Sequence, residues 1–233
     1  MGSLALITTL LILSVIGGGS AVEYSVTNTA ENTPGGTKFN NVIGAEYSQQ
    51  TLAAASDFIW GIFQQTNPAD RKSFDRVSLF IDVFDEVEFK DAPAYASNNE
   101  IHVSARHIND FPGDVKVEFT GILYHEMTHV WQWNGNGNRD EQLLYLNEGI
   151  ADFVRLKAGY PAPGWEGPGK GDRWDEGYSV TARFLEYCDG LKSGFVAELN
   201  KKLRDSYSPN FFQDLLGKSV DTLWAEYKAT YAN

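Results

Sequence analysis

The pattern of hydrophobic and polar residues predicts strands in the first half of the chain and helices in the second. Apolar residues alternate with polar ones in the strand-like segments 24–28, 76–87 and 100–103. They recur at spacings of three and four, which is typical of amphipathic helices, in residues 45–65, 114–133, 142–157, 178–189, 194–204 and about 215–231. Strands followed by a run of helices favour the α+β class.

The predicted helix 114–133 contains the motif HExxH. His125 and His129 are four positions apart, so their side chains lie on one face of the helix. Two neutral imidazoles placed in this way can hold one zinc ion. Glu126 follows the first histidine and could take a proton from water and return it to a leaving amine. By itself the motif also fits an amphipathic helix with two structural histidines.

A second motif supports the zinc interpretation. Glu148 follows His129 by nineteen positions, and the Asn- and Gly-rich segment between them predicts a reversal of the chain. Two histidines and this glutamate would leave a fourth coordination position open, as catalytic zinc requires. Asp152 is one helical turn after Glu148 and could accept a hydrogen bond from a zinc-binding histidine. The alternative, with Asp152 as the third ligand and Glu148 structural, stays open.

Two other metalloprotease patterns are absent. A three-histidine site would need Gly at position 132 and His at position 135, where the chain has Gln132 and Gly135. The inverted order HxxEH does not occur around the motif either. The class in which a glutamate completes the zinc site, the gluzincins, is therefore favoured.

Two blocks of sequence, Leu123–Gly137 and Glu148–Tyr160, resemble the plant basic secretory protein family, whose members are zinc peptidases associated with pathogenesis-related defence. The resemblance extends from about Tyr24 to Tyr227. It implies a zincin-like α+β single domain, with a small mixed sheet over the HExxH helix and a helical C-terminal half. It also implies that His125, His129 and Glu148 bind Zn²⁺ and that Glu126 is the catalytic base. One departure from the family is that this chain is acidic.

A zinc peptidase also needs a donor that stabilises the developing oxyanion. We expect Tyr178 to serve as this second catalytic residue, because it opens a helix directly after a long Gly- and Pro-rich segment, residues 160–177. Tyr160 and His107 are the alternatives. Long loops in compact domains are often functional, so this segment either forms a wall of the substrate cleft, with Trp165 binding substrate, or is a packed surface loop.

In a zincin, an edge strand binds the extended substrate by strand addition. The segment Ala96–Val103 is the candidate for this strand, and His102 is the candidate substrate-binding residue on it. The alternative is that His102 is a structural residue.

The chain termini and the composition set further limits. An apolar run, Leu4–Ile16, followed by small residues up to Ala21, predicts a signal peptide at 1–21 and a secreted, extracellular (apoplastic) domain at 22–233. The run is short for a membrane-spanning helix. Cys188 is the only cysteine, which excludes an internal disulfide. A formal net charge of -12 disfavours binding to nucleic acid or to anionic membranes.

The sequence therefore predicts a monomeric, secreted zinc endopeptidase that acts on proteins or peptides in plant defence. Two alternatives remain. One is a non-catalytic, defence-related binding protein with a structural or vestigial zinc site. The other is an aminopeptidase of the same zinc class.

Overall fold

The computed structural model describes residues 13–14, 22–84 and 90–232. Most of the predicted signal peptide, residues 1–12 and 15–21, therefore lies outside the described residues. The chain divides into two compact units, one with residues 1–54 and 73–119 and the other with residues 55–72 and 120–233. The prediction of one domain over residues 22–233 stays a prediction.

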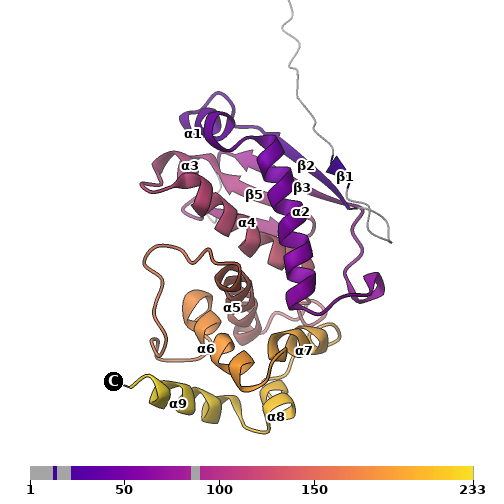
Figure 1. Ribbon diagram of the computed structural model, residues 1–233, viewed down its shortest axis with the longest axis vertical. Helices are drawn as coiled ribbons and strands as arrows, with labels where there is room; N and C mark the ends of the chain where they lie inside the picture. Colours follow the sequence, from indigo (N-terminus) through magenta and orange to yellow (C-terminus); the bar gives the residue numbers. More distant parts are fainter. Residues whose placement is uncertain (1–12, 15–21, 85–89, 233) are drawn as a thin grey trace, which may run out of the picture. The chain divides into compact units, whose positions relative to one another are not determined.

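The first unit contains a mixed β-sheet (Figure 1). Its strands are ordered β1-β2-β3-β5-β4, with the bounds β1 Leu13–Ser14, β2 Glu23–Asn28, β3 Arg76–Asp82, β5 Glu100–Ser104 and β4 Ala94–Ser97. The neighbours β2, β3 and β5 are parallel, whereas β1 and β4 run antiparallel to their neighbours. The small mixed sheet that the sequence predicts is thus present.

The hydrophobic alternation of β3 is confirmed by its burial. Val77, Leu79 and Ile81 are completely buried, and the residues between them are partly exposed. One expectation is wrong: Ala96–Val103 is not a single edge strand. Asn98 adopts a φ of 55°, which asparagine tolerates better than most residues, and the chain reverses there. As a result β4 is the edge strand and β5 lies between β4 and β3.

Short helices complete the first unit. Helix α1 (Pro34–Lys38) packs against α3 (Ala105–Asp110). Thr33 caps α1 by accepting a hydrogen bond from the backbone of Gly36 at 3.1 Å, and proline suits the first turn because its missing N–H would have no helical partner. Helix α2 (Ala45–Ile62) begins in this unit, where Gln49 Nε2 donates to the carbonyl of Tyr24 at 3.0 Å.

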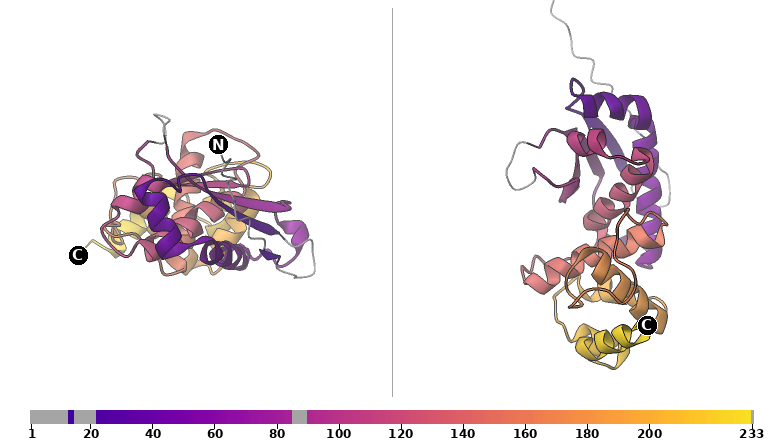
Figure 2. Two further views of the ribbon diagram at one scale, coloured as in Figure 1. Left: turned by 90° about the horizontal axis from the view of Figure 1, so that it is seen from above. Right: turned by 90° about the vertical axis from the view of Figure 1, so that its left-hand side faces the viewer.

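The second unit is helical, as the sequence predicts for the C-terminal half. Its helices are α4 (Val115–Trp131, whose first residues belong to the first unit), α5 (Glu141–Lys157), α6 (Tyr178–Leu191), α7 (Phe195–Lys202), α8 (Phe211–Leu216) and α9 (Val220–Thr230). Helices α5 and α6 lie side by side, and α6 to α9, drawn in orange to yellow, gather around one core (Figure 2). All except the short α8 match predicted helices to within a few residues.

Aromatic side chains form the core of the C-terminal helices. The ring of Phe184 on α6 packs against Phe212, Trp224 and Tyr227, with centroids 5.4 to 5.9 Å apart. Such stacked and edge-on pairs stabilise a core beyond their buried area. This core also holds the end of the long loop 160–177, because Trp174 is buried against Phe184.

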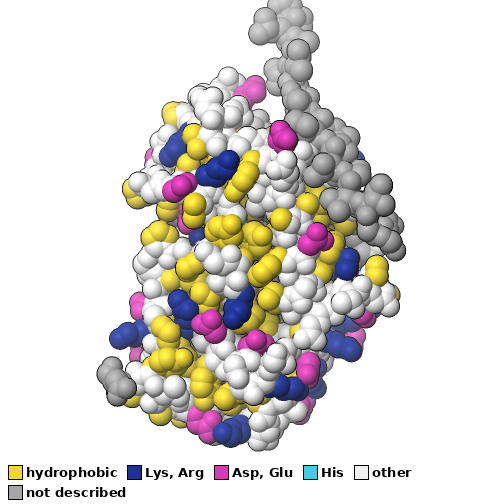
Figure 3. Space-filling view, in the orientation of Figure 1, with side chains coloured by type: hydrophobic (Ala, Val, Ile, Leu, Met, Phe, Trp, Pro, Cys, Tyr) yellow, Lys and Arg dark blue, Asp and Glu magenta, His cyan; other side chains and the backbone are white. Residues whose placement is uncertain are grey.

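Two observations concern the surface of the described residues. On the face of the second unit seen in Figure 3, lysine and arginine side chains are interspersed with aspartate and glutamate. None of the helices within residues 22–84 and 90–232 combines the length and the hydrophobicity needed to cross a membrane.

Candidate active site

Helix α4 places the HExxH motif in the interior of the second unit. Met127 and Val130 are completely buried, and His125 and Glu126 are only 9% and 5% exposed. Thr128 Oγ1 donates to the carbonyl of Tyr124 at 2.7 Å, so its hydroxyl is satisfied within the helix. The motif therefore lies on a helix that is packed inside the second unit.

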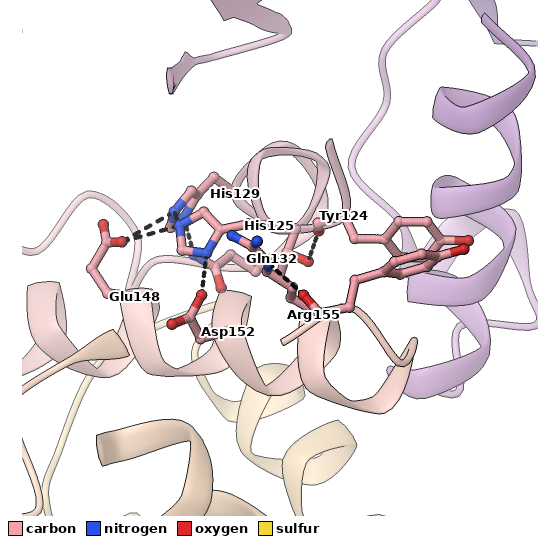
Figure 4. A network of polar contacts seen from close by, with 9 residues as sticks. Tyr124, His125, His129, Gln132, Glu148, Asp152 and Arg155 are labelled. Atoms are coloured by element: carbon pink, nitrogen blue, oxygen red, sulfur yellow. Dashed lines mark hydrogen bonds and ion pairs between the residues drawn. The ribbon is translucent and has the colours of Figure 1, made fainter. Parts of the chain in front are cut away.

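The turn after α4 brings α5 back alongside the motif. Gly135, Asn136 and Gly137 all have positive φ angles, as the Asn- and Gly-rich sequence predicts. Helix α5 then begins after Asp140, whose side chain accepts a hydrogen bond from the backbone of Gln142 at 2.9 Å. This reversal carries Glu148 and Asp152 to the histidines (Figure 4).

His125, His129 and Glu148 converge on one point. The two Nε2 atoms are 3.1 Å apart, and Glu148 Oε2 lies 3.2 Å from Nε2 of His125 and 3.5 Å from Nε2 of His129. A tetrahedral zinc ion with bonds of about 2.0–2.1 Å keeps its ligand atoms roughly 3.3 Å apart. The spacing and the donor types of this group thus fit zinc.

Asp152 fixes the orientation of the first histidine. Its Oδ1 atom accepts a hydrogen bond from His125 Nδ1 at 2.6 Å, and the residue is 3% exposed. Because a carboxylate oxygen accepts, Nδ1 carries a proton. A ring that binds a metal in its neutral form would therefore use the lone pair of Nε2, the atom that faces Glu148. Asp152 therefore lies behind the ligand group, while Glu148 contributes to it.

The electrostatics of the group favour a cation. Burial lowers the pKa of His125, but hydrogen bonds to Asp152 and Glu148 outweigh this effect and raise the pKa to about 10. Burial likewise raises the pKa of Glu148, whereas the charge of His129 and hydrogen bonds to both rings bring it below its ordinary value. The carboxylates of Glu148 and Asp152 stabilise a proton on His125. They would also stabilise a divalent cation bound in place of the proton.

Glu126 is a buried carboxyl group next to the ligand group. Burial raises its pKa, and the two neighbouring histidines oppose that rise. Its Oε2 atom has no hydrogen-bond partner among the described residues. A buried carboxyl oxygen without a hydrogen-bond partner lowers the stability of the fold. A glutamate in such a position is therefore typical of a functional site rather than of a structural one.

Tyr178 contacts the same group from the start of α6. Its ring is parallel to that of His125, with centroids 6.2 Å apart, and the side chain is 54% exposed. Burial of the hydroxyl and the carboxylate of Glu148 raise its pKa to about 12, so the hydroxyl stays protonated and can donate. The backbone of Tyr178 has a φ of 44°, which is rare for a bulky residue, and strained backbones of this kind cluster at active sites.

Comparisons with known proteins identify a peptidase family. The sequence matches the profile of the BSP family, described as "Peptidase of plants and bacteria", over residues 19–227. The chain belongs to the BSP family. A protein named "Basic secretory protease" from Boswellia serrata is 48% identical over 58 residues, which are 25% of this chain and 66% of that protein. The match thus spans slightly less than two thirds of the length of this relative.

Family membership confirms the resemblance drawn from the two motif blocks. Six residues that the sequence predicts for the site lie in the second unit, in mutual contact or close enough to interact electrostatically. They are His125, Glu126, His129, Glu148, Asp152 and Tyr178. The other predicted residues have different surroundings.

His102 belongs to the first unit and to a packed stack. It lies between the rings of Phe80 and Tyr95, at centroid distances of 5.0 and 4.7 Å, and its Nδ1 bonds Asp82 at 2.5 Å. His107, the alternative donor, is also in the first unit, where its Nε2 lies 3.6 Å from Glu118. These contacts are those of structural histidines, and a role of either residue in substrate binding stays a prediction.

Trp165 lies on the loop 160–177 of the second unit, with the guanidinium of Arg155 at 5.5 Å from its ring. The far end of this loop is tied down, since Gly169 N donates to the hydroxyl of Tyr227 at 2.7 Å and Lys228 donates to the carbonyl of Gly171 at 2.6 Å. A role of Trp165 in substrate binding stays a prediction. Tyr160, the other alternative donor, packs its ring against Tyr124 at 5.5 Å.

Gln132 is a site residue that sequence reasoning missed. Its side-chain Nε2 lies 2.8 Å from His129 Nδ1, and the residue is 3% exposed. From the sequence, the only inference drawn from Gln132 is that the three-histidine pattern is absent. The available signal was its position three residues after His129, which brings the two side chains to the same side of a helix.

Proposed function

We propose that this BSP-family chain is a secreted, zinc-dependent endopeptidase with a zincin-like single domain. The observation that supports this most strongly is the convergence of His125 Nε2, His129 Nε2 and Glu148 Oε2 at spacings that suit tetrahedral zinc. A structural site would more often be closed by a fourth protein ligand, whereas the described residues bring three together here.

In this proposal, His125, His129 and Glu148 hold the zinc ion, and Asp152 keeps His125 in the tautomer that presents Nε2. Zinc bound there would supply Lewis acidity, which polarises a peptide carbonyl and makes water acidic enough to react near neutral pH. Glu126 removes the proton from the attacking water and later gives it to the leaving amine. Its raised pKa makes it a stronger base than an exposed glutamate.

Tyr178 would stabilise the oxyanion. Its protonated hydroxyl belongs to a ring that lies parallel to His125, at the exposed side of the ligand group. A donor in this position strengthens its hydrogen bond as negative charge develops on the carbonyl oxygen. We propose His102 and Trp165 as further substrate contacts on the grounds of the sequence alone.

Secretion and a role in plant defence complete the proposal. They are supported by the predicted signal peptide at 1–21, by the resemblance to defence-associated proteins and by the name of the Boswellia serrata relative, a secretory protease. The substrate would be a protein or peptide, with no nucleic acid and no membrane as partner, and the enzyme would act as a monomer.

The first test is hydrolysis of fluorogenic casein by the purified protein and by its Glu126→Gln variant, with zinc content measured in both. Loss of general base catalysis should lower the rate about 10²- to 10⁴-fold while the zinc content stays equal. Equal, substantial rates would refute the proposed mechanism. Equal, near-zero rates with zinc bound to both proteins would favour the non-catalytic binding protein.

A second test addresses the third ligand. Glu148→Ala should lose stoichiometric zinc, because two histidines alone bind zinc weakly. The matched variant is Leu144→Ala, an exposed position one turn earlier on the same helix, which should keep zinc. Full zinc in Glu148→Ala would move the third ligand to Asp152.

A further inference from the structure

Gln132 is held in the interior directly after α4. Its backbone N–H donates to the carbonyl of Thr128 at 2.7 Å, which continues the helical hydrogen bonding by one residue. Its carboxamide meets Nδ1 of His129, and at its other end Oε1 is buried without a hydrogen-bond partner among the described residues. One end of the amide therefore contacts the histidine, and no described residue holds the other end.

The chemistry of zinc binding decides which end of the amide must face the ring. The Nε2 atom of His129 points toward His125 and Glu148, so this atom must carry the lone pair that binds the metal. A neutral imidazole then has its proton on Nδ1, and Nδ1–H needs an acceptor. The amide nitrogen of glutamine can only donate, whereas the amide oxygen accepts.

A half-turn of the carboxamide exchanges its nitrogen and oxygen without moving the rest of the side chain. No described residue bonds Oε1, so the rotation breaks no hydrogen bond at that end of the amide. With Oε1 toward the ring, Gln132 would do for His129 what Asp152 does for His125, which is to accept the Nδ1 proton and leave Nε2 free.

We propose that Gln132 is a positioning residue for the metal site: its Oε1 accepts the Nδ1–H of His129 and keeps that ring in the tautomer and orientation that bind zinc. This inference rests on the proposed function, since it concerns the same site. The partners of the two histidines would then differ in kind, with a carboxylate behind the first and a neutral amide behind the second.

Zinc affinity of the chain from residue 22 to residue 233 tests the proposal. The metal is removed with a chelator, and Zn²⁺ is then titrated in competition with a chromophoric chelator. Gln132→Leu removes the acceptor and should weaken zinc binding about 10- to 100-fold. Gln132→Glu offers a group that can only accept, so it should bind zinc at least as tightly as the parent. Gln65→Leu is the matched control, because Gln65 is also buried with an unpartnered Oε1, and it should leave the affinity unchanged.

A readout that does not depend on affinity is the imidazole proton itself. In the zinc-loaded parent, long-range ¹H–¹⁵N spectra should place the ring proton of His129 on Nδ1, in slow exchange with water. The same signal should persist in Gln132→Glu and should shift upfield and exchange faster in Gln132→Leu. A general loss of packing would not distinguish the two variants in this way, and circular dichroism of both reports whether they fold.

The outcomes separate this inference from the proposed function. If the parent binds no zinc, both fail. If the parent binds stoichiometric zinc but Gln132→Glu is as weak as Gln132→Leu, or Gln132→Leu matches the parent, only the role of Gln132 fails. Coordination of zinc through Nδ1 of His129 would also overturn it. If Gln132→Leu does not fold, the affinity of Gln132→Glu and the parent spectrum still decide.

Discussion

Gly149 lies between the two acidic site residues on α5, and we predict that replacing it with alanine destabilises the protein. A β-carbon added at Gly149 would lie 2.5 Å from Thr181 Cβ on α6 and closer still to its Cγ2. Thr181 cannot turn away, because its Oγ1 accepts a hydrogen bond from Gly177 N at 2.8 Å and donates one to the carbonyl of Trp174 at 2.7 Å. Either α6 moves or both hydrogen bonds break.

Two opposing effects set the magnitude. Overpacking in a core costs about 1–3 kcal/mol, and the upper part of this range applies here because the side chain that is struck is β-branched and completely buried. Replacing glycine with alanine inside a helix raises the free energy of unfolding by up to about 1 kcal/mol, because alanine has the higher helix propensity. The net loss in the free energy of unfolding should be about 1–2 kcal/mol, which corresponds to a fall in Tm of roughly 2–8 °C for a chain of this size.

Urea denaturation and thermal melting of Gly149→Ala measure this loss. The matched controls are Gly61→Ala in α2 and Gly190→Ala in α6, where an added β-carbon meets nothing within 4 Å. Both should gain about 0.5–1 kcal/mol from helix propensity alone. If Gly149→Ala were as stable as these controls, the packing of α5 on α6 described here would be wrong.

Three further predictions concern single side chains. Asp152→Ala should weaken zinc binding about 10- to 100-fold, as measured by chelator competition, because His125 loses its acceptor; unchanged affinity would refute this role. Cys188 should resist iodoacetamide in the folded protein and react in urea, since the thiol is completely buried and burial raises its pKa; rapid labelling without urea would contradict the burial. Burial lowers the pKa of Lys72 to about 8, below its unfolded value of about 10.4, so the charged form costs stability at pH 7. Lys72→Met should therefore stabilise the protein by on the order of 2 kcal/mol at pH 7, and the gain in urea denaturation should disappear as the pH rises through 8 to about 10.5. A gain that does not change with pH would contradict desolvation as its cause.

The sequence predicts the parts of the site that depend on local geometry. His125 and His129 share a face because helical periodicity alone places them there. Glu148 can reach them because the turn between the two helices is short and contains the residues that tolerate positive φ. Helix α5 then adds Asp152 one turn later. Each step depends on helix periodicity or on the residues of one turn. A single sequence therefore contains the information needed to predict it.

The features that the sequence does not predict depend on contacts between distant segments. The φ of 44° at Tyr178 cannot be predicted from a tyrosine in a helical pattern. The hairpin of β4 and β5 depends on a reversal at Asn98 within what otherwise reads as one strand. Gln132 looks like any polar residue near the end of a helix until the ring of His129 is found beside its amide.

At Gly149, a feature that the sequence predicts lies next to one that only the structure explains. The role of its neighbour Glu148 can be predicted from the chemistry of zinc ligands, whereas glycine is required at position 149 because Thr181 on another helix packs against it. The same threonine holds Gly177, the residue directly before Tyr178. A shift of α6 away from α5 would therefore displace the proposed oxyanion donor while leaving the histidines of α4 in place. Gly149→Ala should then lower turnover of casein more than it lowers zinc affinity, which distinguishes damage to the α5–α6 packing from damage to the metal site.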